Sequence, residues 1–177
     1  MIIVLAAVLI AAVAAIWAIS TVNGFKRLEI KVDEALSGIE VALEKRYDML
    51  TKLIDTAKGY MKHETETFTD VIELRNGMSV KDLSARDREM SELSGRLFAV
   101  AENYPELRSS EVFKELSEGI RDAEEHLQAA RRVYNSNVRE YNTAIAMFPA
   151  KLLADGRAPK DFYEAEEIKR QDVSIDF

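Results

Sequence analysis

Cysteine is absent from the 177-residue chain, and proline, histidine and tryptophan are scarce, with three, two and one copies. Without cysteine the chain has no disulfide framework and no thiolate ligand for a metal, although this does not fix the compartment in which it works. Positive charge is also in deficit, because the formal net charge is −7. A dedicated nucleic-acid binder is normally basic. We therefore predict no nucleic-acid partner.

The histidines do not form a metal site in the sequence. His63 and Glu64 begin the H-E-x-x-H zinc signature, but Thr67 stands where the second histidine belongs. The di-metal E-x-x-H pattern is absent too, because Tyr60 and Ala123 precede the two histidines by three positions. No nucleophile–base pair or phosphate-binding loop is present either. We predict no catalytic residue, no metal and no cofactor.

An uninterrupted apolar run occupies residues 2–19 and is followed by Ser20, Thr21 and Val22. At about 1.5 Å per residue, a helix of this length crosses the roughly 30 Å hydrocarbon layer of a bilayer. A single helix also satisfies its own backbone hydrogen bonds there. The sequence thus predicts contact with the lipid bilayer through residues 2–22.

The charges that flank this run predict its orientation. Only Met1 precedes it, whereas Lys26, Arg27 and Lys31 follow it. The positive-inside rule places the basic flank in the cytoplasm, with the N-terminus outside. The alternative is a cleaved signal peptide with a site at residues 18–20, but the basic region that opens such peptides is missing. We expect a single-pass protein of the cell membrane with a cytoplasmic domain.

Helical periodicity continues through most of the remaining chain. Apolar residues recur at steps of three and four, the spacing of one buried helix face. The first stripe comprises Leu28, Val32, Leu36, Ile39, Leu43, Tyr47, Leu50, Ile54, Ala57, Met61, Phe68 and Val71. No proline interrupts it, and it ends at a turn-like segment, residues 76–79.

Two further helices are predicted after this turn. One begins near Ser84, with Asp87 in the capping-box position, and carries the stripe Met90, Leu93, Leu97, Val100 and Tyr104 before Pro105. The other follows a cap at residues 109–110 and ends before Pro149. Its stripe is Phe113, Leu116, Ile120, Ala123, Leu127, Ala130, Tyr134, Val138, Tyr141, Ile145 and Phe148. Alternating Val173, Ile175 and Phe177 favour a short extended segment docked on the bundle.

These elements predict an all-α fold with an anchor at residues 1–23, a bundle domain at 24–148 and a docked tail at 149–177. The first stripe is much longer than the second, so its helix has two possible arrangements. A break near Asp48–Thr51 gives an antiparallel four-helix bundle. An unbroken helix is longer than its neighbours, and the excess length is available for oligomerisation.

Several segments in order resemble one known family. They include VDEALS at 32–37, KRYD at 45–48, AVAENYPEL at 99–107, ARRVYN at 130–135 and FP at 148–149. Together they are similar to the LemA family across nearly the whole chain. The resemblance implies an N-terminal transmembrane helix, a helical bundle and no established catalytic activity, and some relatives organise membrane compartments. The chain departs from the family pattern at Leu36, Gly38 and Thr51, where tryptophan, asparagine and proline are usual.

A group of polar residues close to the apolar stripes predicts a buried structural network. Its members are Arg46, Tyr47, Asp48, Arg131, Arg132, Tyr134, Asn135 and Asn142. We expect Asp48 to pair with Arg131 or Arg132, because buried charge costs several kcal/mol unless it is paired. Asn135 and Asn142 lie seven positions apart, which is about two turns along one helix face. Such a layer sets helix register, and a ligand-binding role is the alternative.

Two classes of function remain open. The first is a non-enzymatic membrane-anchored scaffold or adaptor that contacts a protein partner, or further copies of itself, at the inner face of the cytoplasmic membrane. The second is a sensory or regulatory bundle that binds a small ligand and signals from the membrane. The oligomeric state and a ligand-dependent shift in melting temperature distinguish the two.

Overall fold

The computed structural model describes residues 1–60 and 79–163 of the chain. This part contains four α-helices, α1 (Ile2–Lys58), α2 (Val80–Ala101), α3 (Pro105–Ser109) and α4 (Glu111–Ala146), followed by the 3-10 turn η2 (Ala150–Leu153). No strand occurs in these two ranges. The all-α prediction with a long apolar N-terminal helix is confirmed. The tail segment at 173–177 and the first-stripe positions Met61, Phe68 and Val71 lie outside the described residues.

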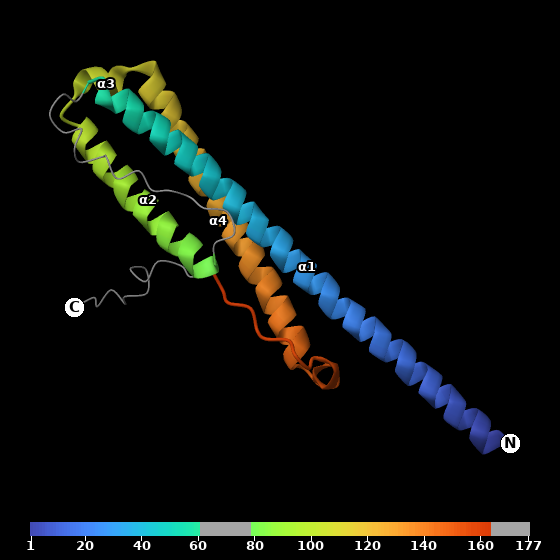
Figure 1. Cartoon of the computed structure of the whole chain (residues 1–177). Helices are drawn as coiled ribbons and strands as arrows, with labels where there is room; N and C mark the ends of the chain where they lie inside the picture. Colours follow the sequence, from blue (N-terminus) through green and yellow to red (C-terminus); the bar gives the residue numbers. More distant parts are fainter. Residues whose placement is uncertain (61–78, 164–177) are drawn as a thin grey trace, which may run out of the picture.

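Helix α1 is one unbroken helix of 57 residues, and it forms the spine of the molecule (Figure 1). At 1.5 Å per residue it is about 85 Å long. No break occurs near Asp48–Thr51, because the chain has threonine rather than proline at this point. The first seventeen residues are all exposed, and bundle contact begins around Ala18, Thr21 and Phe25. The N-terminal third of α1 therefore projects beyond the bundle.

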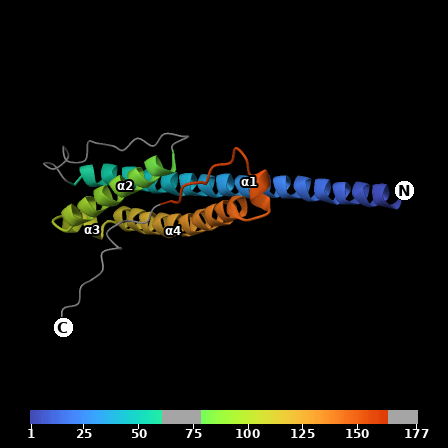
Figure 2. The same ribbon diagram turned by 90° about the horizontal axis from the view of Figure 1, so that it is seen from below.

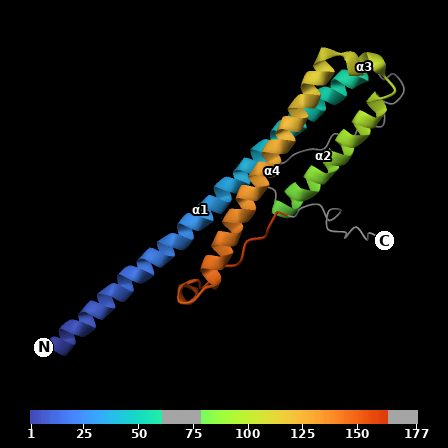
Figure 3. The same cartoon turned by 180° about the vertical axis from the view of Figure 1, so that it is seen from behind.

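The other two long helices pack along the second part of α1. Helix α4 runs antiparallel to α1 and is its main neighbour, while the short α3 closes the far end of the bundle (Figures 1 and 2). Helix α2 lies against them and runs in the same direction as α1, as the reverse view also shows (Figure 3). The bundle thus combines one antiparallel and one parallel helix pair around α1.

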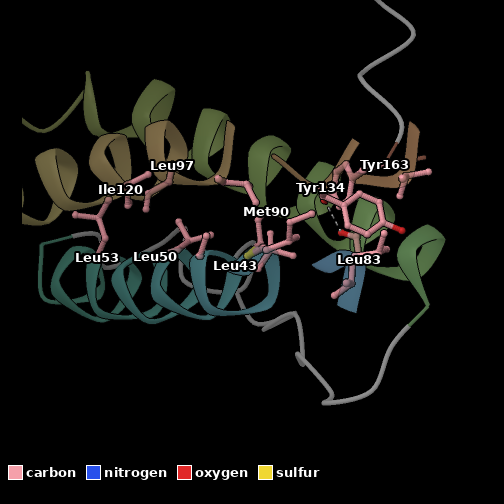
Figure 4. Close-up of a cluster of buried hydrophobic side chains, with 14 of the residues drawn as sticks. Leu43, Leu50, Leu53, Leu83, Met90, Leu97, Ile120, Tyr134 and Tyr163 are labelled. Carbon is pink, nitrogen blue, oxygen red and sulfur yellow. Dashed lines mark hydrogen bonds between the residues drawn. The ribbon is translucent and has the colours of Figure 1, made fainter. Parts of the chain in front are cut away.

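The predicted stripes form the core between these helices. Leu43, Leu50 and Leu53 of α1 face Met90 and Leu97 of α2 and Ile120 of α4 in the close-up (Figure 4). Burial of each such side chain stabilises the fold by about 1.5–3 kcal/mol. Phe148, expected to end the third stripe, is instead 79% exposed, because α4 ends at Ala146.

The helix ends are fixed by polar caps, one of which differs from the prediction. Helix α2 begins after Ser79, whose hydroxyl accepts from the Asp82 backbone N–H while the Asp82 carboxylate accepts from the Ser79 N–H. The predicted start near Ser84 was therefore wrong. The cap expected at residues 109–110 is Ser110, which accepts from the N–H of Phe113 at 3.3 Å.

Beyond η2 the chain turns at Gly156, where φ is +75°, and runs in extended form back along the bundle to Tyr163. We call residues 154–163 the strap. It lies beside α4 and ends near the start of α2 (Figure 1). Ala154 and Tyr163 are buried in the core, so the first part of the expected tail packs on the bundle.

Candidate functional site

A cluster of charged side chains lies inside the bundle, about midway along the part of α1 that has helix neighbours. We call Arg46, Asp87, Glu124 and Arg131 the charge cluster. Arg46 and Asp87 are only 5% and 6% exposed. Long charged residues are almost never buried to this extent unless they are paired. The cluster therefore depends on the geometry of its ion pairs.

Arg46 on α1 connects all three long helices. Its Nη1 lies 2.6 Å from Oδ1 of Asp87 on α2 and 2.9 Å from Oε2 of Glu124 on α4. Its Nη2 donates to the Ser91 hydroxyl at 3.0 Å. The planar guanidinium has donors in a fixed fork, which suits partners on separate helices. Arg46 thereby fixes the register of α2 and α4 against α1.

Asp87 receives a second arginine on its other oxygen, because Oδ2 forms an ion pair with Arg131 of α4. The hydroxyl of Tyr163 lies 3.4 Å from the same Oδ2 and 3.3 Å from the Leu83 carbonyl oxygen. The Arg131 guanidinium carbon is 5.1 Å from the centre of the Tyr163 ring, within cation–π range. Burial raises the pKa of Tyr163, while the charge of Arg131 opposes that shift. Two cations and two carboxylates thus balance in one layer, with Arg46 and Asp87 buried and Glu124 and Arg131 partly buried.

The strap is held to α4 by two asparagines and a tyrosine. The side-chain amide of Asn142 accepts from the Lys160 N–H at 2.8 Å and donates to its carbonyl at 2.9 Å. Asn135 makes the same pair of bonds with Tyr163, at 2.8 and 3.0 Å. An amide side chain carries both a donor and an acceptor, so each asparagine satisfies one strap residue completely.

The Tyr134 hydroxyl adds a bond to the carbonyl oxygen of Asp161 at 2.9 Å. Burial raises the pKa of Tyr134. Together, the bonds from Tyr134, Asn135 and Asn142 hold the strap so that Tyr163 lies beside the charge cluster. The strap and the cluster therefore form one continuous polar structure.

The structure divides the eight predicted network residues into four groups. Arg46 and Arg131 lie in the charge cluster, while Tyr134, Asn135 and Asn142 bind the strap. Tyr47 is half-buried and packs at the edge of the core. The other two, Asp48 and Arg132, are exposed.

Asp48 does not occupy the expected place opposite Arg131. It follows Arg46 by two positions, which turns it about 200° around α1 and away from the buried face. The carboxylate that pairs with Arg131 comes from Asp87 on α2 instead. A sequence signal for this existed, because Asp87 falls in step with the buried residues Leu83, Met90 and Ser94. Glu124 carries the same signal, because it falls in step with the buried residues Ile120 and Leu127. Tyr163 lies outside the helices and has no such periodic signal.

The arrangement suits structural rather than metal chemistry. Within residues 1–60 and 79–163, no group of three or more His, Cys, Asp or Glu side chains could hold a metal ion. His126 is exposed on α4, and His63 lies outside the described residues. The carboxylates of Asp87 and Glu124 form ion pairs with arginines. The layer can therefore fix helix register and dock the strap.

Comparisons with known proteins show which family the chain is similar to. Protein LemA of Metamycoplasma hominis is 27% identical over 161 residues, which cover 85% of this chain and 72% of that protein. Magnetosome protein MamQ of Magnetospirillum gryphiswaldense is 31% identical over 81 residues, or 46% of this chain and 30% of that protein. Magnetosome protein MamQ 2 of Paramagnetospirillum magneticum is 31% identical over 74 residues, which span 42% and 27%. The model of the LemA family matches residues 35–177, and the chain belongs to the LemA family.

Proposed function

We propose that this protein is a non-enzymatic scaffold that is anchored in the cytoplasmic membrane and acts through protein–protein contacts at its inner face. The observation that carries the proposal is the continuity of α1. The same helix supplies the exposed apolar run and the spine of the bundle, with no hinge between them. From residue 22 to Lys58 it extends about 55 Å. In this arrangement the bundle extends away from the bilayer and presents its surface at a distance from it.

The charges that flank the apolar run support the proposed side of the membrane. Lys26, Arg27 and Lys31 are exposed immediately after the apolar run, where they can lie beside the headgroups. A cytoplasmic excess of Lys and Arg sets the orientation of single spans. The LemA and magnetosome relatives support a membrane-associated protein of the LemA type.

One face of α1 offers a contact for a partner. Ile30 and Val41 are 47% and 63% exposed, and they lie eleven positions apart. Eleven residues make about three turns, so both side chains point in the same direction. Glu34 and Ser37 lie between them on this face, so the proposed contact for a helical partner, including a second copy of α1, joins two separate apolar side chains.

The test uses the full chain in living cells. A photo-crosslinking residue at Val41 should give one discrete protein adduct, whereas the same residue at Val133 on α4, which is 55% exposed, is the matched control and should give none. An adduct of twice the chain mass identifies self-association. If neither position gives an adduct, and a small ligand instead raises the melting temperature, a sensory role replaces the scaffold.

The location is tested with a single introduced cysteine, since the chain has none of its own. Ser109 ends α3 at the pole of the bundle farthest from the apolar run, and it is exposed. With Ser109→Cys, a membrane-impermeant thiol reagent should label lysed cells and leave intact cells unlabelled. Labelling of intact cells contradicts the inner-face location.

A further inference from the structure

The turn that follows α4 exposes large apolar side chains at one end of the bundle. We call residues 147–152 the basal loop. Met147, Phe148 and Leu152 are 61%, 79% and 70% exposed. Removing apolar side chains of this kind from water is favourable. Three such side chains in six residues form an apolar patch of the sort that marks a contact site.

The basal loop holds a fixed shape with these side chains directed outward. The Lys151 N–H donates to the Met147 carbonyl at 2.8 Å, and the Leu152 N–H donates to the Pro149 carbonyl at 3.1 Å. Ala150 and Leu153, between and beside the exposed residues, pack against the core. The loop thus has an inner side seated on the bundle and an outer side without a neighbour in the described part of the chain.

The position of the loop relative to α1 indicates what covers the outer side. The 3-10 turn contacts α1, and the guanidinium carbon of Arg157 lies 5.1 Å from the centre of the Phe25 ring. Ala18 and Thr21 share a helix face with Phe25 and are partly covered, whereas the residues before Ala18 are exposed. The apolar run ends at residue 19. The loop therefore lies level with the last turn of the apolar run, as Figures 1 and 3 show.

We propose that the basal loop inserts into the interfacial layer of the same bilayer that α1 crosses and forms a second membrane contact. The inference rests on the anchoring of α1 that the proposed function requires. An apolar group at this level meets the boundary between headgroups and acyl chains, where amphipathic segments bind by burying apolar area. Lys151 is exposed within the loop itself and suits anionic headgroups. The occupant of the patch is lipid rather than protein.

Tryptophan fluorescence tests this proposal, because Trp17 is the only tryptophan in the chain. The full-length double variant Trp17→Phe, Phe148→Trp is reconstituted into vesicles of phosphatidylcholine and phosphatidylglycerol. Brominated acyl chains quench a tryptophan that contacts them, and iodide quenches one in water. We expect brominated lipid to lower the emission roughly twofold and iodide to have little effect, as for an interfacial side chain.

Phe162 supplies the matched control. It is a half-exposed phenylalanine on the strap, past Lys160, whose Nζ lies 3.0 Å from Oδ1 of Asp33 on α1. That places it about 20 Å beyond the end of the apolar run. The double variant Trp17→Phe, Phe162→Trp should respond to iodide and be insensitive to brominated lipid.

The unaltered chain separates the two levels of the argument, because Trp17 reports on the anchor itself. If brominated lipid quenches Trp17 but not the tryptophan at position 148, the anchor stands and the basal loop does not enter the membrane. This result overturns the inference, and a protein partner then becomes the occupant of the patch. If Trp17 is not quenched, the anchor and the inference fail together.

Discussion

Arg46 and Arg131 come from different helices and share the carboxylate of Asp87, so this one residue joins α1, α2 and α4. Glu124 neutralises part of the remaining charge, and Tyr163 lies beside the same carboxylate. Such a layer adds less to stability than its Coulomb energy suggests, because both charges lose water on burial. Removal of one partner is strongly destabilising, because the other charges stay buried without their counter-charge.

The first prediction concerns this carboxylate. Asp87→Ala should lower the free energy of unfolding by about 3–5 kcal/mol, because it leaves two arginines without their shared partner. Chemical unfolding of the full chain in detergent, followed by circular dichroism, measures the change.

Asp48→Ala is the matched control. Its side chain is exposed on the opposite face of α1, and the change should stay within about 0.5 kcal/mol. Equal effects from the two substitutions contradict the assignment of Asp87 as the buried acid.

Sequence reasoning identified Arg46, Arg131 and the two asparagines, because these polar residues fall close to the helical stripes. It missed Asp87 as the acid for a definite reason. The spacing Ser-x-x-Asp occurs twice, at Ser79–Asp82 and again at Ser84–Asp87, and either pair can cap a helix. Only the packing of α2 shows that the first pair caps it and the second is buried.

At the scale of elements, the helices carry few features that weaken them. Gly38 in α1 and Gly95 in α2 lie in exposed helix interiors, and an added Cβ meets nothing within 4 Å. Glycine in such a position costs about 1 kcal/mol relative to alanine. Gly156, between η2 and the strap, is different because its φ of +75° is a conformation that side chains disfavour.

The second prediction follows from this contrast. Gly38→Ala and Gly95→Ala should each raise the free energy of unfolding by about 1 kcal/mol. Gly156→Ala should lower it by about 1 kcal/mol or more, because alanine strains the turn that leads into the strap. Thermal unfolding of the three single variants distinguishes these signs. A stabilising effect at Gly156 contradicts the observed turn.

At the scale of the whole molecule, the length of α1 decides the architecture. The sequence left open whether this helix breaks near Asp48–Thr51, since periodicity is the same on both sides of a break. Thr51 allows the helix to continue, and the contacts of α2 and α4 along it explain how a long stripe is buried without folding back.

The third prediction concerns the length of α1, which can be measured directly. Spin labels on cysteines introduced at Asn23 and Lys58, both exposed on α1, should lie about 50 Å apart, the length of 35 helical residues. Pulsed electron resonance on the full chain in lipid nanodiscs gives the distance. A helix that turned back near Asp48 would bring the labels to roughly 25 Å.

The unbroken passage of α1 from apolar run to bundle has a mechanical consequence. A spanning helix tilts as the bilayer becomes thinner or thicker. Because α1 has no joint at the surface, the bundle must lean by the same angle, and it then acts as a lever. Over an arm of about 55 Å, a tilt of roughly 10° displaces the α3 end sideways by about 10 Å. In a protein anchored as proposed, membrane thickness is thereby converted into the position of whatever the far end of the bundle contacts.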